Sequence, residues 1–220
     1  MSIIEPELTA LKDNLLDMLN LVINQISTCK EAIHKIDVKL AEEVIENEKK
    51  VNSQELAIDR DCENVLALHT PVAVDLRFVL SALRISNDLE RIGDNTNSLA
   101  RFIKHNSKEI NKKLLEEFRL EKMLEILSSM LQDMRHALKS DDTNLAKETL
   151  KKDLLLNEIN KKALKTAEAI LKDQSTNAKV VLRLFSIVRN LERSGDLTKN
   201  IGEEIVFHVE AEVLKHRKDK

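Results

Sequence analysis

The sequence contains little glycine, proline or aromatic residue, and each shortage excludes a class of structure. Three glycines and two prolines in 220 residues leave few helix breakers, so the chain is expected to be almost wholly helical. Trp and Tyr are absent, which argues against a base-stacking surface or a large aromatic ligand pocket. The formal net charge of −3 argues against a nucleic-acid partner, because proteins that bind nucleic acids carry a basic surface.

Cysteines and long apolar segments are scarce as well. The two cysteines, Cys29 and Cys62, are too few for a disulfide framework and are expected to be buried thiols in a reducing compartment. No apolar run approaches the roughly 18 residues that a membrane-spanning helix needs, and the N-terminus has no signal-peptide pattern. We therefore expect a cytoplasmic protein without membrane insertion.

The most informative feature of the chain is an internal repeat. Residues 89–96 return as residues 191–198, about 102 positions later, with six of the eight positions identical. Two of the three glycines stand at the same place in the two copies. A duplication of this size predicts two versions of one domain, which we place at residues 1–107 and 108–220.

Apolar residues at three- and four-residue spacing predict three long helices in each half. Asp37 is expected to cap the second helix, and Thr70 followed by Pro71 is expected to begin the third. Polar segments at 106–111, 140–142 and 173–177 are expected to be the boundary and the turns. The predicted helices cover residues 7–35, 38–68, 71–104, 114–139, 143–172 and 178–214. Short turns make neighbouring helices antiparallel, so the predicted fold class is all-α, with two tandem antiparallel three-helix bundles.

The repeated peptide carries a pair of carboxylates in each copy. Glu90 and Asp94 are four residues apart, and so are Glu192 and Asp196. Residues at this spacing share one face of a helix, about 6 Å apart. A glycine inside each of these helices costs roughly 1 kcal/mol relative to alanine, which suggests that a neighbour or a ligand approaches the backbone there.

Antiparallel register adds oxygen ligands from the preceding helix of each half. Counting back from the turns near residues 70 and 175 places four residues level with the carboxylate pairs, namely Glu48 and Asn52 in the first half and Asp153 and Asn157 in the second. We call Glu48, Asn52, Glu90 and Asp94 the first station, and Asp153, Asn157, Glu192 and Asp196 the second station. Because Ile26 and Leu131 of the first helices are apolar at this level, both stations are expected in an outer groove.

Two interpretations of these stations compete. Three carboxylates packed together are electrostatically costly unless a cation compensates them, and hard or borderline ions such as Mg, Mn, Fe or Zn suit oxygen ligands. Alternatively, Arg91 and Arg193, or lysines of the second helix, neutralise the carboxylates as surface ion pairs. Two further motifs, which contain Glu31 with His34 and Asp133 with His136, lie near helix ends and are weaker candidates for metal ligands. No P-loop, nucleotide-binding glycine motif or Ser/Cys–His pattern is present.

The repeated residues resemble the PhoU family of bacterial phosphate-transport accessory and signalling proteins. The similarity extends over nearly the whole chain and is most specific at residues 71–77, 87–94 and 190–203. It implies tandem three-helix bundles, iron or zinc clusters at the paired motifs, dimerisation and negative regulation of the phosphate-starvation response. It also implies two partners, the phosphate-sensor histidine kinase and the ATPase of the phosphate transporter. By position, it further implies that the residues of both stations are metal ligands.

The chain departs from the family pattern at both stations, and the two stations also differ from each other. Asn52 and Asn157 stand at the last position of the second-helix acidic motif, which lowers the charge available for metal. The second station is also flanked by Arg189 and Lys199, where the first has Asn87 and Asn97; two cations should weaken metal binding there. The favoured function is a non-enzymatic regulator of phosphate transport, and the alternative is a metal-dependent enzyme, which would need an open coordination site and a general base.

Overall fold

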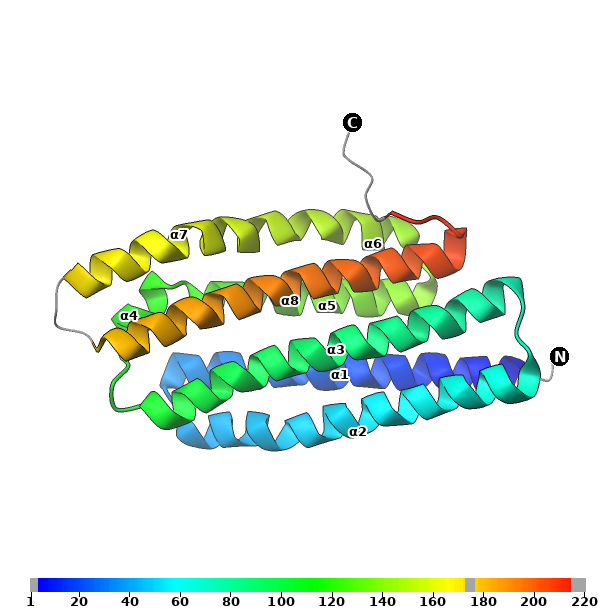
Figure 1. The fold of residues 1–220 in the computed structure, drawn as a ribbon, viewed down its shortest axis with the longest axis horizontal. Coiled ribbons are helices and arrows are strands. Elements are labelled where there is room, and N and C mark those ends of the chain that lie inside the picture. Colours follow the sequence, from blue (N-terminus) through cyan, green and yellow to red (C-terminus); the bar gives the residue numbers. More distant parts are fainter. Residues whose placement is uncertain (1–3, 173–176, 215–220) are drawn as a thin grey trace.

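The structure, a computed structural model, describes residues 4–172 and 177–214, and every regular element in these residues is a helix. About nine-tenths of the described residues are helical. The axes of the long helices are nearly aligned, which makes the molecule elongated (Figure 1). The predicted all-α fold class is confirmed.

The first half consists of three long helices. These are α1 (Glu5–Lys35), α2 (Val38–His69) and α3 (Ala73–Asn106). Asp37 caps α2, because its carboxylate accepts backbone N–H bonds from Lys39 at 2.8 Å and Leu40 at 3.3 Å, and this prediction is confirmed.

The start of α3 differs from the prediction. Thr70 adopts a left-handed conformation with φ of 46° and ends α2, so it does not cap the next helix. Val72 is extended and precedes the first helical residue, Ala73. Pro71 therefore lies in the turn, where its missing N–H breaks no helical hydrogen bond.

The second half is more segmented than the repeat suggests. It consists of α4 (Lys112–Glu117), α5 (Leu120–Ser140), α6 (Thr143–Thr149), the 3₁₀-helix η1 (Leu150–Lys152), α7 (Asp153–Lys172) and α8 (Ala178–Glu210). The predicted helix 114–139 is divided at Arg119, which has a φ of 54°, and the predicted helix 143–172 is interrupted by η1. The last helix ends at 210 instead of 214, because Ala211 turns left-handed. Of the predicted turn 173–177, residues 173–176 lie outside the described residues.

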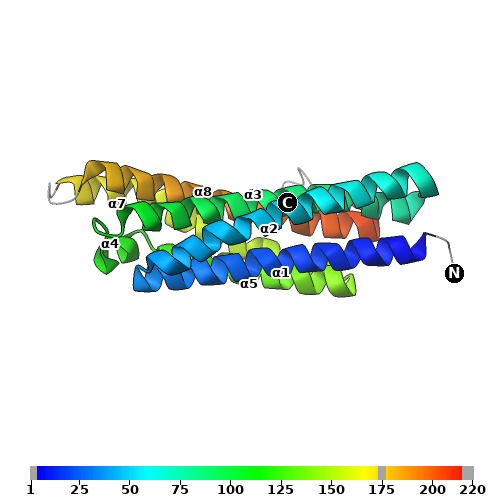
Figure 2. The same ribbon diagram turned by 90° about the horizontal axis from the view of Figure 1, so that it is seen from below.

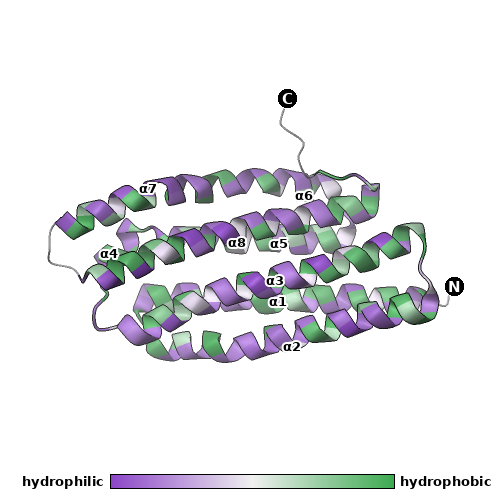
Figure 3. Cartoon of the chain, viewed as in Figure 1, coloured by the Kyte–Doolittle hydropathy of each residue, from purple (hydrophilic) through white to green (hydrophobic). Residues whose placement is uncertain are grey.

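The two halves pack along two long seams. Helix α3 lies against α8, and α1 lies against α5 (Figures 1 and 2). Apolar and polar segments alternate along each helix (Figure 3), as amphipathic helices require. The buried apolar side chains of both halves form one continuous core. Whether residues 1–107 and 108–220 are separate domains therefore stays a prediction.

Candidate functional site

The first station lies on the facing surfaces of α2 and α3. Glu48 accepts a hydrogen bond from the side-chain amide of Asn97, and its Oε2 is 3.7 Å from Nη2 of Arg101. Burial and then the neighbouring Asp94 raise the pKa of Glu48, and Arg101 opposes them. A surface depression of about 450 Å³ is lined by Glu48, Asp94, Asn95, Asn97, Ser98 and Arg101. The predicted neighbourhood of Glu48 and Asp94 is therefore present.

The acidic surface extends further along α2 than the sequence pattern indicated. Burial, then Asp94 and Glu55, raise the pKa of Glu90. Glu55 itself has a raised pKa because of burial and the nearby Asp59. Glu55 lies seven residues after Glu48, on the same helix face, and this spacing could have identified it. These carboxylates disfavour one another's charged forms, which is the situation that a bound cation relieves.

The second station already contains a cation from the protein itself. The Asp153 side chain is 2% exposed, and the Nζ atom of Lys199 lies 3.3 Å from its Oδ2. Lys199 is also 3.6 Å from Oδ1 of Asp196, and Asn157 donates a 2.8 Å hydrogen bond to Asp153. Burial disfavours the charged ammonium, but Asp153 and Asp196 outweigh it and raise the pKa of Lys199. Burial and then Asp196 raise the pKa of Glu192.

The donor atoms of the stations can be compared with the needs of a metal ion. Among the residues that the structure describes, no group of three or more His, Cys, Asp or Glu side chains is arranged to hold one. Buried side-chain oxygens of Asn52, Asn97 and Asp153 nevertheless have no hydrogen-bond partner among these residues. The first station thus offers an unsatisfied oxygen of Asn52 and neighbouring carboxylates, a donor set whose chemistry suits a hard or borderline cation. The second fits less well, because the Lys199 ammonium already contacts both Asp153 and Asp196.

The repeated glycines are explained by neighbouring side chains. A Cβ atom on Gly195 would lie 2.4 Å from Cδ1 of Leu156 and 2.7 Å from Oδ1 of Asp153. On Gly93 it would lie 3.2 Å from Oε1 of Gln25. Gln25 is buried on α1, and its amide has no hydrogen-bond partner in the described chain. The sequence reasoning, which placed the apolar Ile26 at this level, did not identify it.

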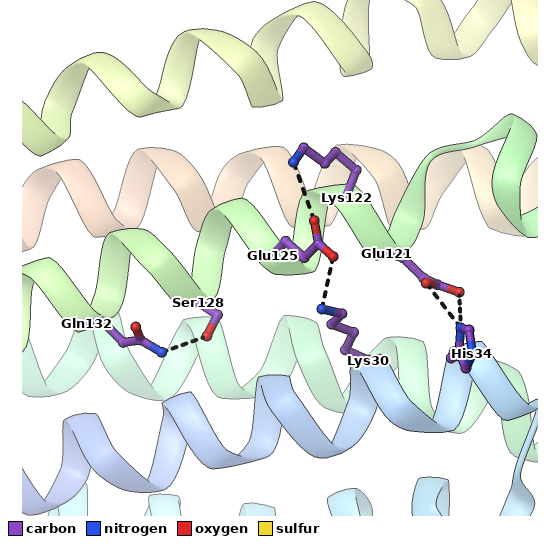
Figure 4. A network of polar contacts seen from close by, with 7 residues as sticks. All are labelled: Lys30, His34, Glu121, Lys122, Glu125, Ser128 and Gln132. Atoms are coloured by element: carbon purple, nitrogen blue, oxygen red, sulfur yellow. Dashed lines mark hydrogen bonds and ion pairs between the residues drawn. The ribbon is translucent and has the colours of Figure 1, made fainter.

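The weaker metal-ligand candidates have structural partners instead. His34 of α1 lies 3.2 Å from Glu121 of α5, within a polar network that also pairs Lys30 with Glu125 at 2.9 Å (Figure 4). Asp133 accepts hydrogen bonds from Lys152 and Thr149. These contacts fasten elements together at the surface.

Arginines provide only part of the charge compensation at the carboxylate pairs. Arg91 lies 3.8 Å from Asp88, one turn away on the same helix, and its charge lowers the pKa of Glu90 against the stronger effect of burial. Arg101, which the sequence reasoning did not identify, contacts Glu48. Ion pairs with arginines therefore compensate part of the negative charge of the first station. They do not bring the pKa values of Glu48 and Glu90 back to their ordinary range.

No described helix is both long and apolar enough to cross a membrane.

Comparison with known proteins gives a consistent result over almost the whole chain. The model of the PhoU domain family matches residues 15–103 and 120–205. The phosphate-specific transport system accessory protein PhoU homolog 1 of Thermotoga maritima is 30% identical over 204 residues, which cover 92% of this chain and 87% of that protein. The accessory protein PhoU of Escherichia coli is 29% identical over 210 residues, covering 96% and 86%.

Solved structures show the same similarity. The crystal structure of PhoU from Pseudomonas aeruginosa has a TM-score of 0.86 and 28% sequence identity, and the match covers 95% of this chain and 100% of that one. The phosphate transport system regulatory protein PhoU from Streptococcus pneumoniae has a TM-score of 0.84 and 27% identity, covering 96% and 98%.

Proposed function

The chain belongs to the PhoU family, and we propose on that premise that it is an adaptor that negatively regulates phosphate transport and phosphate-starvation signalling. The support is the family match in both halves, together with relatives whose names describe accessory proteins of a phosphate-specific transport system. Its proposed partners are the phosphate-sensor histidine kinase and the transporter ATPase, which it would meet in the cytoplasm as a homodimer.

The observation that carries the proposal to particular residues is the duplicated pair of carboxylates. We propose that Glu48, Asn52, Glu90 and Asp94 hold a transition-metal ion, iron or zinc in preference to Mn or Mg. When bound, such an ion would supply positive charge between α2 and α3. Burial raises the pKa of Glu48 and Glu90, and the neighbouring Asp94 raises it further. A bound metal would relieve this unfavourable charge and so fasten the two helices together. Asp153, Asn157, Glu192 and Asp196 are the corresponding, weaker ligands.

A metal-dependent enzyme is the second candidate. Catalysis would require a general base in reach of the metal, and no histidine lies among the residues of either station. The names of the relatives describe accessory proteins. We therefore favour the regulator.

A deletion strain tests the proposed function. Loss of the protein is expected to switch on phosphate-scavenging genes when phosphate is plentiful, because the negative regulator is missing. The measurement is a scavenging-gene reporter together with phosphate uptake in phosphate-rich medium. Unchanged expression and unchanged uptake would contradict the proposal, and rescue by the restored gene is the control.

A further inference from the structure

The seam between α3 and α8 has two pseudo-equivalent ends. The helices run antiparallel (Figure 1), and the side chain of Asn95 donates a 3.0 Å hydrogen bond to Ser194 near the middle of the seam. Because residues of α8 repeat those of α3 about 102 positions later, one end of the seam should match the other in shape. A difference in charge between the two ends then comes from the side chains that differ between the two copies of the repeat.

One end is compensated within the molecule. Arg84 of α3 lies 3.1 Å from the buried carboxylate of Glu204 on α8, and Ser81 donates to the same carboxylate at 3.1 Å. The surrounding cleft is also lined by acidic side chains, among them Glu55 and Asp59. Positive charge at this end therefore has carboxylate neighbours from the protein itself.

The other end forms a cavity of about 210 Å³, which we call the basic cleft. Its lining residues follow the i, i+3, i+4, i+7 pattern of a single face on each helix. They are Ser98, Arg101, Phe102 and His105 of α3, and Arg183, Ser186, Ile187 and Asn190 of α8.

The lining of the basic cleft is rich in hydrogen-bond donors, and the carboxylate nearest to it that the described residues show is Glu48, 3.7 Å from Arg101. Arg101 and Arg183 approach from opposite helices, and no Asp or Glu of the described residues lines the cleft. Nδ1 of His105 lies 2.7 Å from the backbone oxygen of Arg101, so this nitrogen is assigned as the donor. Ser98 and Ser186 add hydroxyl groups. Phe102 and Ile187 are buried and form an apolar floor.

We propose that the basic cleft binds a tetrahedral oxyanion of the phosphate class, either inorganic phosphate or a small phosphomonoester. Guanidinium groups form charge-assisted, bidentate hydrogen bonds with such anions, and two of them on opposite walls can hold oxygens that point in different directions. Hydroxyl groups from Ser98 and Ser186 supply further donors. Without a ligand, Arg183 would be an ordinary solvated side chain, and neutralising it would have the same small effect as neutralising any surface arginine; Arg101 would keep only its long contact with Glu48.

The position of Arg101 links this cleft to the first station. Its guanidinium lies 3.7 Å from Glu48, a long contact, and the same side chain lines the basic cleft. An oxyanion that attracts Arg101 would remove a positive charge from the neighbourhood of Glu48. This consequence concerns the proposed metal site, but the oxyanion site itself does not depend on metal.

Calorimetric titration of the full chain, treated with a chelator and dialysed, tests the proposal without metal. The probes are sodium phosphate and phosphoserine at constant ionic strength, with sodium chloride as the non-specific control. We expect saturable binding of one phosphate probe per chain, and the two probes distinguish the free ion from a phosphomonoester. Arg183→Gln should weaken binding tenfold or more, since it removes a charged donor.

Matched variants separate a site from general surface charge. Arg193→Gln removes the same charge from an exposed position of α8 outside the cleft and should change affinity less than twofold. Ser186→Ala keeps the charge and should weaken binding severalfold, and circular dichroism confirms that each variant is folded. The proposal is overturned if neither probe binds saturably, or if Arg193→Gln weakens binding as much as Arg183→Gln. In either case the metal stations and the regulatory function would stand or fall on their own tests.

Discussion

Replacing Lys199 by asparagine would give the second station the side chain that the first has at Asn97. The Lys199 ammonium lies 3.3 Å from Asp153 and 3.6 Å from Asp196, so it neutralises the carboxylates that a metal ion would use. A metal ion held by Asp153 would stand close to this ammonium and be repelled by it. Removing this charge should therefore strengthen metal binding.

The size of the effect follows from Coulomb's law. A divalent ion and an ammonium roughly 5 Å apart repel by about 1.7 kcal/mol at the dielectric constant of water, and by about four times as much at an effective value of 20. The Lys199 side chain is 34% exposed, so the lower figure is the safer one. It corresponds to more than a tenfold gain in affinity.

The assay is a metal titration in a Glu90→Gln/Asp94→Asn background, in which only the second station can bind. Lys199→Asn should bind zinc or ferrous iron more than tenfold tighter than the background protein. Lys172→Asn is the matched control, because this exposed lysine lies at the far end of α7, about 28 Å from Asp153 along the helix, beyond the Debye length.

Stability supplies a second readout for the same variant. Without metal, Lys199→Asn leaves the buried Asp153 carboxylate without its ammonium partner and should cost about 1–3 kcal/mol, which added metal should restore. If Lys199→Asn neither binds metal more tightly nor gains stability from it, the account of the two stations is refuted.

Two further predictions concern stability. Gly195→Ala should cost about 1–3 kcal/mol of stability through overpacking, because its Cβ would lie 2.4 Å from Leu156. Gly93→Ala, whose Cβ would have its nearest neighbour at 3.2 Å, should be nearly neutral. Equal losses of stability in denaturant unfolding would contradict this prediction. Burial lowers the pKa of His208 from 6.5 to about 4, although Asp141 opposes the shift. The unfolded chain therefore takes up a proton at this position as the pH falls from 6.5 to 4 and the folded chain does not, so stability should fall by up to about 3 kcal/mol over this window. His208→Gln should reduce that slope in unfolding measured at several pH values, and an unchanged slope would count against the prediction.

Much of the fold could be predicted because its signals are local. The spacing of apolar residues defines the long helices, and the cap at Asp37 follows from the hydrogen bonds that its short side chain can accept. The break at Arg119 could not be predicted in this way. Arg119 is left-handed although it is not a glycine, so no residue type marks the break in the sequence. The neighbouring Phe118 is buried in the core.

The site could be predicted only as far as helix register allows. Counting residues brought Glu48 to the level of Asp94, but side-chain rotamers decide that Asn97 and Arg101 contact Glu48. Lys199 was identified as a neighbour of the second station because it lies three residues after Asp196. The basic cleft was beyond sequence reasoning, since it depends on how α3 packs against α8, and no spacing within either repeat specifies that contact.

The most direct test of the central claim joins the first station to regulation. A deletion strain that carries a phosphate-scavenging reporter is complemented with the wild-type gene or with Glu90→Gln/Asp94→Asn, and both proteins are checked for equal abundance. In phosphate-rich medium we expect the wild type to silence the reporter and the double variant to leave it active. Full silencing by the double variant would contradict the claim that this chain regulates phosphate transport through metal at its first station.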